Sequence, residues 1–85
     1  MTMADTIAGK LGQALLPREI EVLDVSHKHA GHSGWREGGG THFEVTIRAD
    51  IFAGKSRVEC HRMVNVILAD ELASSVHALQ LDLSA

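Results

Sequence analysis

The sequence predicts a single α+β domain, in which a mixed three-stranded sheet carries two helices on one face. Apolar residues recur at helical spacing in two segments and alternate with polar residues in the strand-like ones, in the order helix, strand, strand, helix, strand. A hairpin followed by a helical crossover gives a mixed sheet. With 85 residues, the whole chain (1–85) forms one such domain.

The first half of the chain predicts a helix and a hairpin. A helix is expected over about residues 4–15, and Pro17 ends it because the residue before a proline disfavours helical geometry. A first strand begins around Ile20. Near its end the apolar residues shift from one face of the strand to the other, which predicts a twist or bulge there. The cleanest strand is His42–Ala49, where apolar and polar residues alternate strictly. One face of that strand is therefore buried.

The second half predicts a turn, a helix and a last strand. Residues 52–55 form a short turn, with Phe52 inserted into the core. A second helix is expected from about Arg57 to Leu72. The last strand runs from Val76 to Leu83, with three leucines on the core-facing side.

Composition excludes several classes of protein. One cysteine cannot form an internal disulfide, which favours a reducing compartment. No apolar run reaches the roughly 18–20 residues of a membrane helix, and the N-terminus lacks the order of a signal peptide. We therefore expect a cytoplasmic protein with no membrane partner, monomeric when free. The net charge of −3 disfavours strong non-specific binding of nucleic acid.

The connection between the first two strands concentrates candidate ligands. Residues 27–41 hold three histidines and five glycines, and structureless loops of this length are uncommon unless they are functional or disordered. His61 opens the second helix and could meet His27, His29 or His32. This set is too small for a closed zinc site, so it indicates either a metal shared with a second protein or a solvated loop that happens to contain histidines.

Other chemically versatile residues have more ordinary interpretations. Cys60 is an alternative ligand, but a small hydrophobic residue at the edge of the apolar stripe is the simpler reading. His42 is expected on the polar face of its strand, and His77 on the core face of the last strand, as a hydrogen-bonded core histidine. Trp35 either anchors a partner or shields the base of the loop.

Five short motifs, in order along the chain, resemble the BolA-like family. They are Val22-Leu23-Asp24-Val25-Ser26 followed by His29, Thr41-His42-Phe43-Glu44-Val45, Phe52-Ala53-Gly54-Lys55, His61-Arg62-Met63-Val64, and Glu71-Leu72 with Val76-His77-Ala78-Leu79. Together they cover nearly the whole chain. The resemblance implies a fold similar to class II KH domains.

The resemblance also implies a function. BolA-like proteins pair with monothiol glutaredoxins and share a [2Fe-2S] cluster across the interface, in iron–sulfur assembly, trafficking or iron regulation. Carried over by position, the ligands are His29 and His61, with His27 or His32 able to replace His29 in this longer loop. The glutaredoxin and its glutathione would supply thiolates. Such a protein is an adaptor and not an enzyme.

The same resemblance carries an alternative, a small DNA-binding transcriptional regulator. Lys55, Arg57 and Arg62 cluster around the start of the second helix and would contact the duplex. This chain departs from the family there, because Cys60 stands where the Arg-His-Arg motif has its first arginine. It also lacks the Gly-x-x-Gly clamp of nucleic-acid-binding KH domains after the turn. These departures weaken the DNA role more than the metal role.

Overall fold

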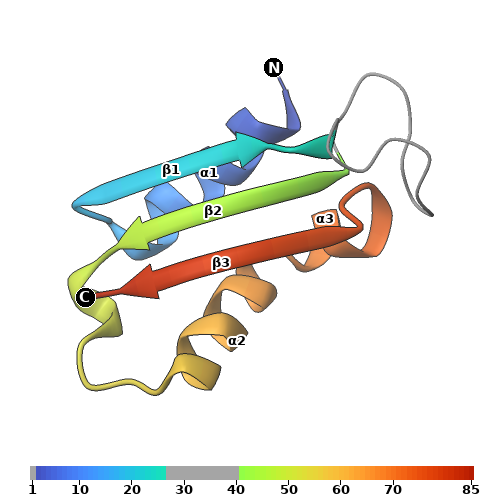
Figure 1. The fold of residues 1–85 in the computed structure, drawn as a ribbon. Coiled ribbons are helices and arrows are strands. Elements are labelled where there is room, and N and C mark those ends of the chain that lie inside the picture. The colour runs from blue at the N-terminus through green and yellow to red at the C-terminus, as the bar shows by residue number, and fades with distance from the viewer. Residues whose placement is uncertain (1, 27–40) are drawn as a thin grey trace.

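The computed structural model describes residues 2–26 and 41–85, and it has the predicted α+β architecture. The central strand β2 pairs antiparallel with β1 and parallel with β3, which makes the sheet mixed (Figure 1). None of the helices in these two segments is long and apolar enough to cross a bilayer. The elements are α1 (Met3–Leu15), β1 (Glu19–Asp24), β2 (His42–Arg48), η2 (Asp50–Phe52), α2 (Arg57–Ile67), α3 (Ala69–Ser74) and β3 (Ala78–Ser84).

Local sequence fixes where the two longer helices begin. In α1, the Thr2 hydroxyl accepts from the Asp5 N–H while the Asp5 carboxylate accepts from the Thr2 N–H. Ser56 and Glu59 form the same reciprocal capping box at α2. These bonds satisfy backbone donors that the first helical turn leaves without partners. They also hold the pKa of the Asp5 and Glu59 carboxyls below their ordinary values, because the ionised form accepts the backbone bond.

The core lies between the sheet and the helices. Alternate residues of β2 point into it, as the strict alternation of this strand predicts. Phe52 is buried from the turn side, as expected. The connected core cluster of the described residues consists of Ile7, Leu11 and Leu15 of α1, Phe43, Val45 and Ile47 of β2, Ala49 and Phe52, Cys60, Val64 and Leu68, and Val76.

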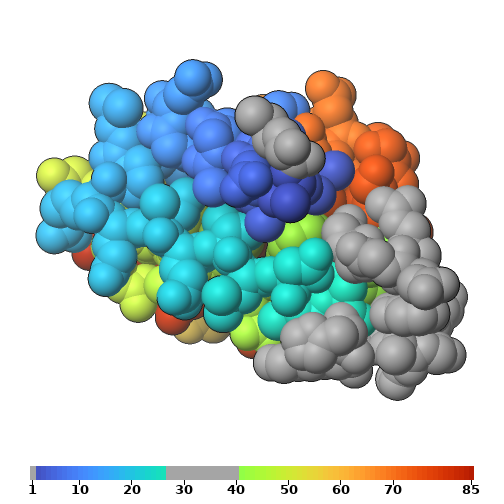
Figure 2. Space-filling model, turned by 90° about the horizontal axis from the view of Figure 1, so that it is seen from above, coloured from blue at the N-terminus to red at the C-terminus, as the bar shows by residue number. Residues whose placement is uncertain are grey.

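The prediction of one helix from Arg57 to Leu72 is wrong, because the chain bends at Leu68. Leu68 has φ −100° and ψ 20° and is fully buried, and α3 leaves the axis of α2 after it. Glu71 of α3 pairs with Lys10 of α1, with 2.7 Å between Nζ and Oε2. Figure 2 shows α3 beside α1 at one end of the molecule. The bend therefore brings α3 against the first helix.

The end of β1 also differs from the prediction. Pairing with β2 is one-to-one from Glu19 to Asp24, so this strand contains no bulge. Leu23 lies 46% exposed, while Val25 is buried just after the strand ends. The change in the face that carries the apolar residues marks the point where the chain leaves the sheet, and the predicted alternative of a bulge is wrong.

Candidate functional site

The two ends of the histidine-rich connection are tied together by one serine side chain. The Ser26 hydroxyl accepts from the backbone N–H groups of Thr41 and His42, each at 3.1 Å, and donates to the Asp24 carboxylate at 2.6 Å. The Val25 N–H donates to the His42 carbonyl at 2.9 Å, as the next antiparallel pair would. The serine thus replaces a strand carbonyl where β1 leaves the sheet, and it fixes the base of the connection.

His77 lies directly beside this base. Its backbone N–H donates to the Thr41 carbonyl at 2.8 Å, one residue before β3 begins. Its side chain is exposed. The prediction that His77 is a hydrogen-bonded core histidine is therefore wrong. The alternation of exposed and half-buried residues in β3 starts only at Ala78, so it does not determine which way the residue before the strand faces.

His42 is the second imidazole at this end of the sheet. Its position in the alternation of β2 predicts the polar face, yet His42 is buried. Its Nδ1 lies 2.8 Å from the Thr41 hydroxyl. The rings of His42 and His77 have centroids 6.4 Å apart. An exposed imidazole therefore stands next to a buried one whose ring is oriented by a hydroxyl group.

His61 lies at a different place. It is half-buried and lines a recess of about 260 Å³ together with Arg57 of α2 and residues 81–83 of β3. Leu81 lies four residues along β3 from His77, which corresponds to about 13 Å of extended strand. The base of the connection and His61 are thus separated along the edge strand.

The remaining metal candidates divide into two groups. His27, His29 and His32 lie outside the described residues, and so does Trp35, the candidate partner anchor. Cys60 is 4% exposed within the apolar core, which agrees with its reading as a small hydrophobic residue. Across 2–26 and 41–85, no three histidine, cysteine or acidic side chains are grouped as a metal site.

The basic residues proposed for DNA contact are on the surface. Lys55, Arg57 and Arg62 are all exposed, around the start of α2. The ion pairs of the described part, Lys10–Glu71, Arg18–Asp50 and Arg48–Asp82, involve none of these three. A small positive surface is therefore available beside the Phe52 turn.

Comparison with known proteins identifies the family. Residues 11–85 match the family model described as BolA-like protein. The chain belongs to the BolA-like family. The curated relatives of this BolA-like chain include the chloroplastic and mitochondrial SufE-like protein 1 of Arabidopsis thaliana, 47% identical over 79 residues, which cover 88% of this chain and 21% of that protein. They also include proteins named as DNA-binding transcriptional regulators. The one from Vibrio cholerae is 40% identical over 75 residues, covering 88% of this chain and 67% of its own.

Solved BolA domains have the same fold. The BolA domain of SufE1 from Arabidopsis thaliana superposes with a TM-score of 0.89 at 43% identity, covering 99% of this chain and 92% of that one. This likeness agrees with the three-stranded mixed sheet and the helices found here. Since the chain spans about a fifth of the SufE-like relative, the activity of that whole protein does not transfer to it.

Proposed function

We propose that this chain is a non-enzymatic adaptor that binds a monothiol glutaredoxin and co-ligates a shared [2Fe-2S] cluster. The sequence expectation pairs a loop histidine, by position His29, with His61. The geometry favours a different second ligand. His77 takes that role in this proposal, and His61 becomes the alternative.

The exposure of His77 at the base of the histidine-rich connection is the observation that carries the proposal. Its backbone is held by Thr41, and Thr41 is held by Ser26, so the backbone of His77 is fixed next to Ser26 and Thr41. In this proposal, a loop histidine meets the His77 ring at this end of β3. To reach His61, the same histidine would have to travel about 13 Å further along that strand.

The donor set fits a cluster that is shared between two proteins. The lone thiol, Cys60, is buried, so this chain would contribute imidazoles and the glutaredoxin with its glutathione would contribute thiolates. Histidine ligation raises the reduction potential of an iron–sulfur cluster relative to all-thiolate ligation. An imidazole must also be deprotonated to bind metal. The bound cluster would therefore be a cargo that is lost more readily as the pH falls.

A comparison of three histidine variants tests the assignment. The chain is co-purified with a monothiol glutaredoxin, and the visible circular dichroism of the heterocomplex is recorded for His77→Ala, His29→Ala and His61→Ala. We expect the first two substitutions to abolish the spectrum that distinguishes the heterocomplex from the glutaredoxin homodimer, and His61→Ala to retain it. Far-ultraviolet circular dichroism checks that each variant is folded.

Retention of the spectrum in His29→Ala with loss in His77→Ala would assign the loop ligand to His27 or His32, and other results would contradict the proposal. Loss of the spectrum in His61→Ala with retention in His77→Ala would assign the second cluster ligand to His61 of α2. An unchanged spectrum in all three variants, or no heterocomplex with the unmodified chain, would show that this chain does not hold a cluster in this way.

DNA binding is the second candidate function, favoured by relatives that are named transcriptional regulators and by the exposed cations near α2. It predicts an affinity that falls steeply with salt, because Lys55, Arg57 and Arg62 would displace counterions from phosphates. Charge reversal at Lys55 should weaken binding and reduce the salt slope. Absence of binding near physiological ionic strength would eliminate this function.

A further inference from the structure

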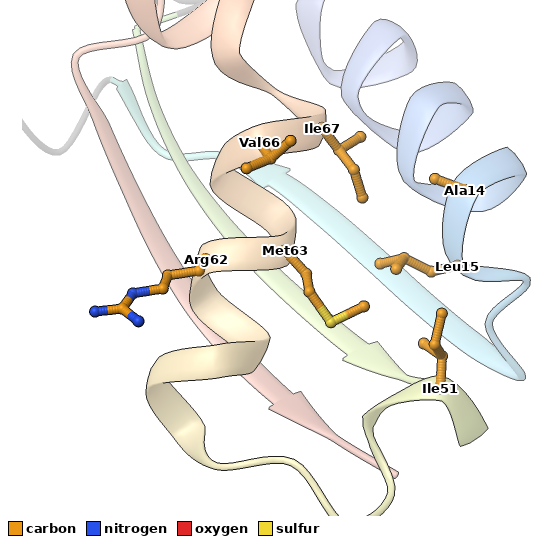
Figure 3. Close-up of a pocket in the computed structure, with 7 residues that line it drawn as sticks. All are labelled: Ala14, Leu15, Ile51, Arg62, Met63, Val66 and Ile67. Carbon is orange, nitrogen blue, oxygen red and sulfur yellow. The ribbon is translucent and has the colours of Figure 1, made fainter.

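An apolar groove lies between the C-terminal end of α1, η2 and α2. Its volume is about 460 Å³, and it is open to the surface. In Figure 3 the side chains of Leu15, Ile51 and Met63 converge on the same space, while the Arg62 guanidinium points away from Met63. The full lining is Ala14, Leu15, Ile51, Arg62, Met63, Val66 and Ile67.

Exposed apolar side chains concentrate around this groove. Val66 is 77% exposed and Ile51 is 42% exposed. Leu16, the residue after Leu15, is 81% exposed and adopts left-handed geometry with φ 47°, a position that helix ends usually give to glycine. Neither burial nor backbone preference favours a leucine there. Val66 and Ile51 both line the groove, and exposed apolar side chains that gather at one place on a surface are typical of an interaction site.

A positive charge lies at the edge of the groove, on the side of α2 that faces away from Met63. Arg62 is the charged member of the lining, and it forms no ion pair among the described residues. The nearby Asp50 carboxylate is already paired with Arg18 at 3.2 Å. Val58, Arg62 and Val66 follow one another at intervals of four along α2, so they lie on one side of the helix. A ligand that fills the groove and extends over this side of α2 therefore meets the apolar lining first and then the Arg62 guanidinium, which has no ion pair among the described residues.

We propose that the groove binds an amphipathic helix of a partner protein, which presents apolar residues at helical spacing and a carboxylate opposite Arg62. Helices dock in such grooves through anchors at i, i+3, i+4 and i+7. A symmetric pair of copies is disfavoured, because a two-fold contact would bring both Arg62 side chains to one interface without a lining carboxylate. The proposal does not depend on the cluster, because it uses none of the histidines.

Two synthetic peptides test this proposal. Each is an amphipathic helix of about 14 residues with leucines at the four anchor positions, and they differ only in carrying glutamates or lysines on the polar flank. Fluorescence anisotropy gives their affinities, and amide shifts locate the binding site. We expect shifts at Ala14, Ile51 and Met63, with the glutamate peptide bound about tenfold more tightly, a difference of about 1.4 kcal/mol.

Matched variants distinguish binding in the groove from non-specific hydrophobic binding. Arg62→Glu should invert the preference between the peptides, whereas Lys55→Glu, at an exposed cation outside the groove lining, should leave it unchanged. Val66→Asp should weaken both peptides about tenfold or more, as loss of an apolar anchor does. Leu23→Asp, at an exposed leucine on β1, should have no effect on binding.

Four results would overturn the proposal. The first is the absence of amide shifts up to about 1 mM peptide, since a Kd of about 1 mM corresponds to a binding free energy of only about 4 kcal/mol. The second is equal affinity for both peptides, and the third is a set of amide shifts that maps outside the groove. The fourth is a different occupant. A dimer in sedimentation velocity that Val66→Asp abolishes would assign the groove to a second copy of the chain, and a DNA duplex that displaces the peptide would assign it to nucleic acid.

Discussion

Substitution of Ser26 by alanine should destabilise the domain by about 2–4 kcal/mol. The Ser26 hydroxyl accepts from the N–H groups of Thr41 and His42, both residues being buried, and alanine leaves these two donors without that acceptor. An unsatisfied buried donor costs about 1–3 kcal/mol. The bond to Asp24 adds little to this cost, because that carboxylate is exposed and water can replace the serine.

Urea unfolding and amide hydrogen exchange measure this effect. In thermal unfolding, at about 4–8 °C per kcal/mol for a domain of this size, Tm should fall by at least about 8 °C. The amides of Thr41 and His42 should lose the most protection. Ser74→Ala is the matched control, since its exposed hydroxyl only donates to a carbonyl within its own helix and its loss should change stability by less than about 0.5 kcal/mol. A cost below about 1 kcal/mol for Ser26→Ala, with unchanged protection of both amides, would refute the clamp.

Three further substitutions examine packing, backbone geometry and the helix–helix ion pair. Phe52→Ala should cost about 3–5 kcal/mol in urea unfolding because it empties a buried site, and a cost near zero would contradict the position of the ring in the core. Leu16→Gly should stabilise the domain by about 0.5–1 kcal/mol in the same assay, since it relieves left-handed geometry and removes little buried surface. A decrease in stability would mean that the leucine packs within the domain. The hydrogen bond from Lys10 holds the pKa of Glu71 below its ordinary value of 4.5, so the pair stabilises the fold fully above that pH and loses its effect as pH falls through the folded-state pKa. The unfolding free energy of the unmodified chain should exceed that of Glu71→Gln by about 1 kcal/mol at pH 7, and this gap should narrow below about pH 4.5; a gap independent of pH would contradict the ionic origin.

The sheet was predictable because its pattern follows from burial on one face. The strict alternation from His42 to Ala49 arises because β2 is central and one of its faces contacts the helices. Pro17 likewise sets the boundary of the first helix, because its constraint is local. The order of the elements and the rules of chain connection then leave few topologies. The mixed sheet follows from these local facts.

The bend at Leu68 and the exposure of His77 could not be read from the sequence. No proline or glycine marks the bend, and the contact that α3 makes with the first helix, Glu71 to Lys10, joins residues 61 positions apart. His77 shares parity with three leucines, but the register of the parallel pair begins at His42 and Ala78, which leaves His77 outside the strand. Local pattern extended the strand beyond its first paired residue. The assignment of His61 rests on its place at the start of the second helix and on the family resemblance, and it stays a prediction.

The separation of the two proposed sites limits what can occupy them together. The groove lies beyond the end of β2, near Ile51, and His77 lies at the start of that strand. The seven residues of β2 place these sites about 20 Å apart. A standard protein interface covers about 800 Å² per partner, a disc about 16 Å in radius, so two such discs centred 20 Å apart would overlap. If the glutaredoxin of the proposed function covers the His77 end, the groove has room for a slender element and not for a second globular face. A single helix satisfies this spatial limit, which itself rests on the proposed function.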